Sequence, residues 1–156
     1  MTPSSPKAVS GAVDYLRSWF IQWTKHKDLI LRRIEKIETM EGKTIIHMKD
    51  KEVQAMIETR LETAIPKLTQ GWIQIVTLHN DENKKILIKE WETFIQFPKL
   101  TLFFINPFSK GDTRWTIHPY THQQICDPDS LKTGLSTMGE LVDPLTPEEL
   151  EVKIRD

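Results

Sequence analysis

The chain has 156 residues, of which 38% are hydrophobic and 28% charged, with a formal net charge of −1. These values are typical of one globular domain with its own core and exclude a largely disordered chain. The near-neutral charge argues against nucleic acid as a partner, and no apolar run approaches the roughly 20 residues that a membrane span needs. One cysteine excludes an internal disulfide, and the first residues do not resemble a secretory signal, so we expect a cytoplasmic protein.

The N-terminal part predicts a flexible tail followed by one long helix. Residues 1–11 contain two prolines and four serine or threonine residues, as flexible termini often do. Over residues 12–38, apolar side chains recur at steps of three and four, which predicts a helix lying across a sheet. This stripe consists of Val13, Leu16, Phe20, Trp23, Ile30, Ile34 and Ile37.

The middle of the chain predicts a strand, a helix and then a run of strands. A β-prone segment at residues 44–48 precedes a helix capped by Asp50 and ended by Pro66. Four strands follow, separated by polar turns. They are expected at residues 72–78, 85–91, 100–105 and 114–118.

The C-terminal part predicts a last helix, starting at Asp127 or Asp129, and an acidic tail or short helix over residues 146–156. Residues 12–145 therefore form a single α+β domain. We expect an antiparallel sheet of about five strands, in the order α-β-α-β-β-β-β-α, with the long helix and two shorter helices on one face. Residues 17–36 carry a net charge of +4 and residues 140–156 a net charge of −4. These two segments would neutralise each other within the chain or between subunits.

Residues 118–127 hold the densest group of metal-binding and nucleophilic side chains, namely His118, His122, Cys126 and Asp127. Their H-x3-H-x3-C spacing would place three zinc ligands on one helix face, although Pro119 opposes a continuous helix from His118. Asp127, Asp129 or a distant His47 or His79 would complete the zinc site. Alternatively, Cys126 is a catalytic thiolate with a histidine base. The remaining interpretation is an ordinary connector between a strand and a helix.

Two further segments are candidate binding surfaces. Trp19, Phe20 and Trp23 lie among basic residues of the predicted long helix, which favours docking on the protein's own sheet or self-association. A membrane surface or RNA would also suit this pattern. The loop over residues 106–114 carries Lys110, Gly111 and Arg114, which would cradle an anion or simply form a turn.

Glu90 and Glu92 would share one face of the strand expected at residues 85–91. Their spacing suits an acid/base pair, and it also suits the solvent side of an amphipathic strand.

No nucleotide-binding, zincin or hydrolase motif occurs in the sequence. We therefore expect a small cytosolic, non-catalytic domain that binds a partner protein or a small ligand, with no cofactor. The alternatives are a metal-dependent or thiol-based enzyme centred on His118, His122 and Cys126, with zinc as the metal, and an interaction module or homo-oligomer built on the helix over residues 12–38.

Overall fold

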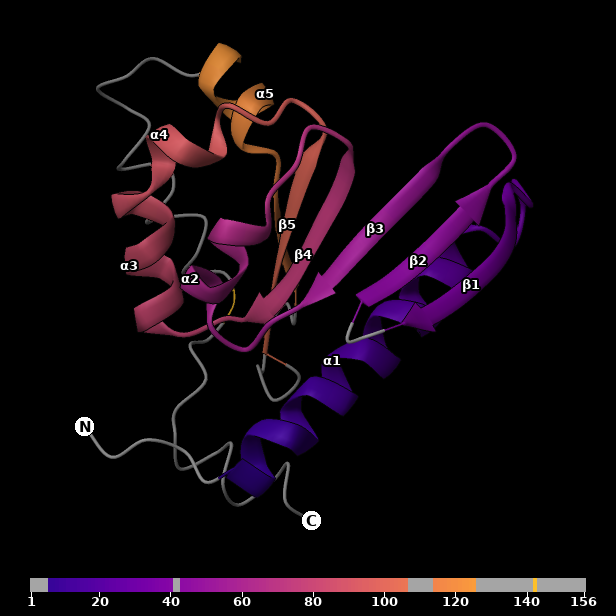
Figure 1. Ribbon diagram of the computed structural model, residues 1–156, viewed down its shortest axis with the longest axis horizontal. Helices are drawn as coiled ribbons and strands as arrows, with labels where there is room; N and C mark the ends of the chain where they lie inside the picture. The colour runs from indigo at the N-terminus through magenta and orange to yellow at the C-terminus, as the bar shows by residue number, and fades with distance from the viewer. Residues whose placement is uncertain (1–5, 41–42, 107–113, 126–141, 143–156) are drawn as a thin grey trace.

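Six strands form a single sheet whose spatial order follows the chain, β1-β2-β3-β4-β5-β6. The computed structural model describes residues 6–40, 43–106, 114–125 and 142 (Figure 1). The strands are β1 (Ile34–Met40), β2 (Lys43–Met48), β3 (Glu52–Ile57), β4 (Trp72–Leu78), β5 (Leu100–Ile105) and β6 (Arg114–Ile117). The helices are α1 (Pro6–Lys27), α2 (Leu61–Ala64), the 3-10 turn η1 (Ile65–Lys67), α3 (Asp81–Lys89), α4 (Trp91–Phe94) and α5 (Pro119–Ile125).

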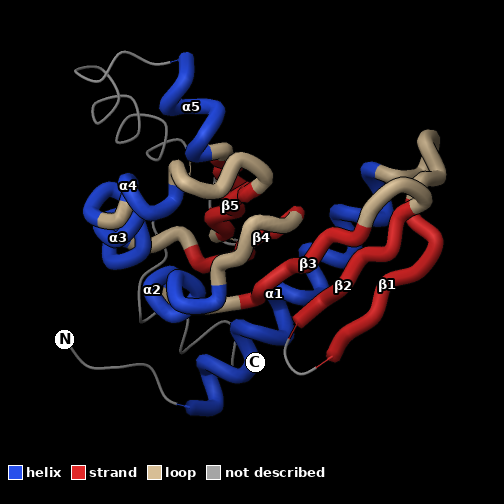
Figure 2. Tube along the Cα trace, turned by 45° about the horizontal axis from the view of Figure 1, so that its top comes forward, coloured by secondary structure: helices blue, strands red, loops and turns tan. Residues whose placement is uncertain are grey.

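The sheet is mixed, which corrects the expectation of about five antiparallel strands. β1, β2 and β3 form an antiparallel meander, β3, β4 and β5 are mutually parallel, and β6 returns antiparallel to β5. Parallel neighbours require a crossover that leaves the sheet and comes back. The α2–η1 segment makes the first crossover and the α3–α4 segment the second, where the sequence predicted a further strand at residues 85–91 (Figure 2).

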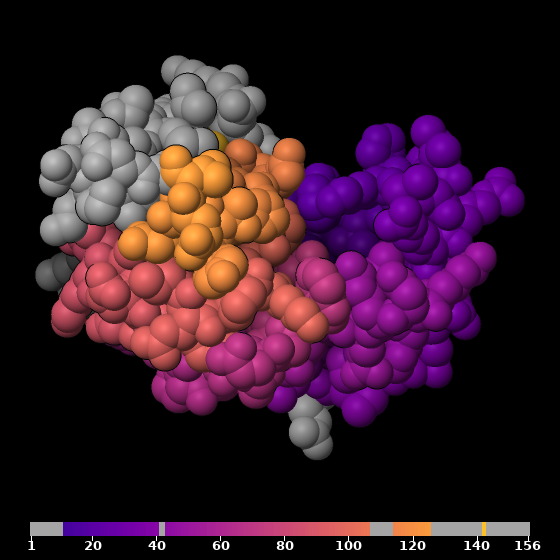
Figure 3. All heavy atoms as spheres, turned by 90° about the horizontal axis from the view of Figure 1, so that it is seen from above, coloured from indigo at the N-terminus to yellow at the C-terminus, as the bar shows by residue number. Residues whose placement is uncertain are grey.

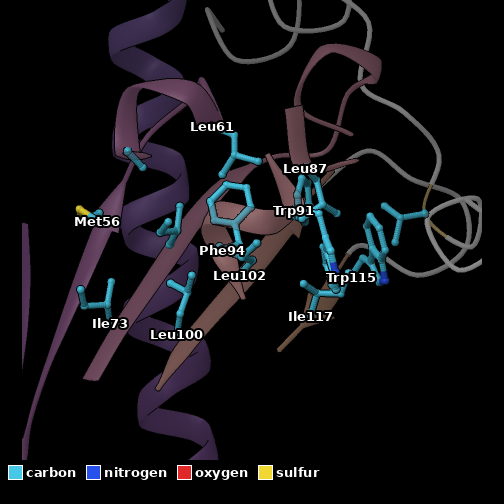
Figure 4. Packing of buried hydrophobic residues seen from close by; sticks show 14 residues of the cluster. Met56, Leu61, Ile73, Leu87, Trp91, Phe94, Leu100, Leu102, Trp115 and Ile117 are labelled. Atoms are coloured by element: carbon cyan, nitrogen blue, oxygen red, sulfur yellow. The ribbon is translucent and has the colours of Figure 1, made fainter. Parts of the chain in front are cut away.

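Helices cover both faces of the sheet, so the expectation of helices on one face was also wrong. α1 packs against β3 and β4, over a cluster that includes Phe20, Val76 and Phe103. α2, α3 and α4 contribute Leu61, Leu87 and Phe94 to a second cluster on the opposite face, shown in Figure 4. Neighbouring residues of a strand point to opposite faces, so each central strand contributes to both clusters.

The first helix is displaced from the range expected for it. α1 begins at Pro6 and ends at Lys27, and Ile34 and Ile37, which were expected on the helix, lie in β1. The chain turns because the Asp28 carboxylate accepts the backbone N–H groups of Arg33 at 2.8 Å and Ile34 at 3.0 Å. Arg32 completes the turn with a φ of 49°. The helical spacing of the isoleucines beyond Lys27 is therefore a coincidence.

In the middle of the chain, a strand is found where a helix was expected, and a helix is found where a strand was expected. The first half of the helix predicted after Asp50 is the strand β3, which pairs with β2, and only its second half is helical, in α2 and the start of η1. The strand predicted at residues 85–91 is instead covered by α3 and the start of α4. α3 starts because the Asn80 side chain accepts the N–H of Asn83 at 2.8 Å, which is an N-cap.

The other expected strands are confirmed, since β2, β4, β5 and β6 lie where the sequence predicts them. The C-terminal helix and the segment at residues 146–156 lie outside the described residues, except that Val142 is buried in the cluster beneath α3 and α4. Residues 1–5 also lie outside.

Candidate functional site: a basic groove beside helix α1

A groove of about 450 Å³ opens on the face of the sheet that α1 partly covers. Its lining includes the last turn of α1, with Trp23 and Lys27, and residues at the amino ends of β3, β4 and β5. Figure 3 shows the molecule hollowed between the orange segment of β6 and α5 and the indigo to purple segment of α1, β1 and β2. The groove exists because α1 ends at Lys27 and leaves this end of the sheet uncovered.

The floor of the groove is a polar strip that crosses three strands. Beneath α1, this face carries apolar residues such as Val76 and Phe103. Two positions earlier along the same strands stand Gln74 and Thr101, which are paired in register. Thr101 Oγ1 lies 3.1 Å from Nδ1 of His118 at the end of β6. Polar residues replace apolar ones where the helix no longer shields the face, so the strip is open to a hydrogen-bonding ligand.

The groove is strongly basic although the whole chain has a net charge of −1. Five lysine or arginine side chains line it: Lys27, Arg33, Lys51, Lys99 and Arg114. Asp28 is the only carboxylate among the described lining residues, and its oxygens accept the backbone N–H groups that close the turn. None of the five cations forms an ion pair with another described residue. No carboxylate in the described part of the chain therefore neutralises these charges by an ion pair.

Two tryptophans hold four of these cations at the rim. Lys51 Nζ lies 3.9 Å and Lys99 Nζ 5.1 Å from the ring centre of Trp72. Lys27 Nζ and the Arg114 guanidinium carbon each lie 5.0 Å from that of Trp23. Such contacts are attractive because the ring face is electron-rich. They restrict cations that would otherwise sample solvent.

Two buried polar atoms in the groove have no hydrogen-bond partner among the described residues. They are Oε1 of Gln74 and Oγ1 of Thr24. Buried polar atoms in folded proteins are nearly always paired. A ligand that carries a hydroxyl or N–H group would satisfy the Gln74 acceptor.

The pKa of His118 lies below its usual value of 6.5. The main cause is partial burial, which disfavours the charged imidazole, and the neighbouring charges of His122 and Lys27 act in the same direction. The unfolded chain consequently binds a proton at this position at a higher pH than the folded chain. The contribution to stability is present above pH 6.5 and is lost as the pH falls through the lowered pKa.

We expect His118 to be neutral at pH 7 and to become a cation as the pH falls through its lowered pKa. Imidazole proton shifts measured by NMR should show a pKa below 6.5. His118→Gln should remove this residue's part of the pH dependence of the free energy of unfolding, which urea unfolding above and below pH 6.5 measures. A His118 pKa at or above 6.5 would contradict the partial burial of the imidazole.

The predicted metal cluster is only partly within the described residues. The backbone N–H of His122 donates to the carbonyl oxygen of His118 at 2.9 Å, and His122 Nδ1 lies 3.0 Å from the same oxygen. Residues Pro119–Ile125 are helical, with the proline at the first position where it fits best. The helix therefore begins after His118, as Pro119 indicated. Cys126 and Asp127 lie outside the described residues, and the zinc site and the thiol enzyme stay predictions.

The two distant histidines do not complete that metal site. His47 is on β2, and β3, β4 and β5 lie between it and the end of β6. At about 4.8 Å per strand this separation is far beyond a metal's reach. His79 follows the carboxyl end of β4, whereas His118 lies beside its amino end. Within the described ranges, no three potential ligands converge.

The predicted interface residues make their contacts inside the chain. Phe20 is buried, and Trp19 and Trp23 are half-buried. The rings of all three lie 5.1–6.4 Å from the ring of Phe103 on β5. The interpretation as a helix docked on its own sheet is the one that these contacts favour.

Of the predicted anion loop, Arg114 lines the groove, while Lys110 and Gly111 lie outside the described residues. The predicted carboxylate pair does not form on a strand, because Glu90 joins α3 to α4 and Glu92 lies in α4.

Sequence reasoning missed most of the groove. Its cations come from segments far apart in the chain and meet only through the sheet order. One signal was present: Gln74 and Thr101 are polar positions on otherwise apolar faces of β4 and β5, and Thr116 of β6 pairs with Phe103 on the same face. Polar residues at neighbouring positions of adjacent strands indicate that this end of the sheet face is not covered by a helix.

Comparison with protein-family models, curated protein sequences and solved structures finds no match to this chain. Among the described helices, none combines the length and apolar character needed to cross a bilayer. Function is therefore inferred from the geometry of the groove.

Proposed function

We propose that the protein is a binding protein that takes a small anionic ligand, carrying phosphate or carboxylate groups, into the groove beside α1. The convergence on one concavity of five basic side chains that form no ion pair with another described residue, in a chain of net charge −1, is the observation that carries this proposal. A volume of about 450 Å³ is within the range of sites that hold small molecules.

The lining suits an anion with hydrogen-bonding groups. Lysine and arginine recognise phosphate and carboxylate through charge-assisted hydrogen bonds. Arg114 also donates to Thr116 Oγ1 at 2.9 Å, which orients its guanidinium beside the polar strip. The strip itself would contact the neutral part of the ligand through Gln74 and Thr101.

Pyrophosphate is a direct probe of this site. We expect it to raise the melting temperature of the protein and to bind with a Kd measurable by calorimetry. Lys99→Gln combined with Arg114→Gln should weaken binding by about 100-fold or more, because each charged hydrogen bond contributes about 1.5–3 kcal/mol.

A matched control replaces two lysines on the other side of the sheet. Lys85→Gln with Lys89→Gln on α3 removes the same charge from exposed positions and should leave pyrophosphate binding unchanged. Equal weakening in both double variants would mean diffuse electrostatic attraction, and the absence of any shift in the parent protein would refute the proposal. Urea unfolding of each variant separates loss of the site from loss of the fold.

A further inference from the structure

The turn between α1 and β1 presents three consecutive aliphatic side chains to solvent. Leu29 is 64% exposed, Ile30 92% and Leu31 57%. We call residues 29–31 the apolar tip. Single exposed apolar residues are ordinary on protein surfaces, but a contiguous group usually marks a contact surface.

The apolar tip is held in place by hydrogen bonds. Besides the two backbone groups that its carboxylate accepts, Asp28 receives the Arg32 N–H on its carbonyl oxygen at 2.8 Å. The Asp28 N–H in turn donates to the carbonyl oxygen of Thr24 at 3.1 Å, which ties the turn to α1. The three side chains are therefore presented by a closed turn on a rigid helix.

Basic residues surround the apolar tip on both sides in the sequence. Lys25 and Lys27 precede it and Arg32 and Arg33 follow it, all four exposed. Asp28 is the only acidic residue in this segment, and its carboxylate is turned to the backbone. Aliphatic residues flanked by cations are the pattern of proteins that insert into the headgroup region of an anionic bilayer.

The apolar tip is continuous with the groove. Leu31 of the tip lines the groove, as do the basic residues Lys27 and Arg33 that flank the tip. The side chains of β1, β2 and β3 that line the groove are aliphatic, namely Ile34, Ile46, Met48 and Val53, with Arg33 and Lys51 in the adjoining turns. The side chains of β4, β5 and β6 include the polar and basic residues Gln74, Thr101, Arg114 and Thr116, together with Trp72, Ile73 and Phe103. Such a division suits a molecule with an anionic head and an apolar chain.

We propose that the protein attaches to anionic lipid surfaces, with the apolar tip inserted among the lipid chains and a phosphate-bearing headgroup in the groove. The headgroup site rests on the proposed function, whereas the insertion rests on the apolar tip alone.

The observations favour lipid over single-stranded nucleic acid. Base stacking needs open aromatic faces. Trp23 stacks on Trp19 at 5.8 Å and carries two cations, and Trp72 also carries two. An exposed aliphatic tip adds nothing to the binding of a polyanion in water, but it adds directly to the binding of a bilayer.

Co-sedimentation of the full chain with vesicles tests the inference. We expect binding to vesicles of phosphatidylcholine mixed with phosphatidylglycerol, and little binding to phosphatidylcholine alone. Leu29→Ser with Ile30→Ser, two tip residues that do not line the groove, should reduce the bound fraction by about tenfold or more, because insertion scales with apolar area. Met40→Ser, at an exposed apolar position at the far end of β1, is the control and should bind like the parent.

Equal binding of the protein to both kinds of vesicle would overturn the inference, and so would undiminished binding of the tip variant to anionic vesicles. Release of the protein from anionic vesicles by a single-stranded oligonucleotide, bound more tightly than the vesicles, would also overturn it. A dimer in solution that the tip variant converts to monomer would assign the tip to a second copy instead. The tip variant should keep its pyrophosphate response. If the parent protein responds to pyrophosphate but does not bind vesicles, the proposed function stands and attachment to a lipid surface is rejected.

Discussion

Replacing Asn83 by alanine is expected to lower the free energy of unfolding by about 3–5 kcal/mol. Its buried amide joins the two crossovers to the sheet: Oδ1 accepts the N–H of Leu61 at 2.9 Å. Nδ2 lies within hydrogen-bond distance of Thr59 O, Leu78 O and Thr77 Oγ1, at 2.9, 2.8 and 3.1 Å. Alanine would leave several of these groups buried and unpaired, each at a cost of about 1–3 kcal/mol.

Urea unfolding measures this loss, and two controls give it a scale. Asn80→Ala removes only the N-cap of α3 and should cost about 1 kcal/mol. Lys85→Ala, on the exposed side of the same helix, should change stability by less than about 0.5 kcal/mol. If Asn83→Ala costs no more than Asn80→Ala, Asn83 is not the link between crossover and sheet that its hydrogen bonds indicate.

Phe103→Ala is expected to destabilise the protein by about 3–5 kcal/mol and to loosen α1. Phe103 is buried on β5, and its ring contacts those of Trp19, Phe20 and Trp23 at 6.4, 6.1 and 5.1 Å. These are the main aromatic contacts that hold the helix on the sheet, and Trp23 also forms a wall of the groove. Removing the ring should therefore weaken pyrophosphate binding as well.

The next residue provides the matched control, because Phe104 points to the opposite face and packs against Trp115 at 5.0 Å. Phe104→Ala should cost a similar amount of stability while leaving α1 in place. Hydrogen exchange under native conditions distinguishes the two variants: amides of α1 should exchange faster in Phe103→Ala than in Phe104→Ala. Equal exchange of α1 in both variants would contradict the role assigned to Phe103.

The distribution of charge in the structure changes what the net charge of the chain says about its partners. A net charge of −1 argues against a polyanionic partner only if the charged residues are evenly distributed over the surface. The structure shows instead that cations are concentrated in one groove and beside the apolar tip. Average charge is a poor guide when distant segments bring like charges together.

Local patterns in the sequence determined several elements correctly. The apolar run at residues 100–105 indicated a strand covered on both faces, which is β5. The turn residues around it, and the alternation at residues 72–78, placed β4 and β6. The apolar stripe of Leu16, Phe20 and Trp23 correctly indicated a helix lying across a sheet. These signals were sufficient because each depends on neighbours in the chain and on whether a face is buried.

Other local patterns were compatible with two structures, and tertiary contacts decided between them. Val53 and Ile57 are spaced for a helix face, yet both are equally well spaced for one face of a strand, and pairing with β2 selects the strand. Asn80, Asp81 and Glu82 suit a hairpin turn as well as a helix start, and the N-cap contact selects the helix. That choice makes β5 the parallel neighbour of β4, because helices take the place of the antiparallel strand expected between them.

The sequence alone thus determined the class of fold, the central strands and the apolar side of α1, because burial imposes a periodic pattern on neighbouring residues. Only the tertiary structure decided the direction of the strands, the end of α1 and the groove. The charges of Lys27, Lys51, Lys99 and Arg114 come together because the strand order and the early turn at Asp28 bring their segments to one uncovered end of the sheet. No periodicity within the chain encodes that convergence, since it depends on contacts between segments far apart in sequence.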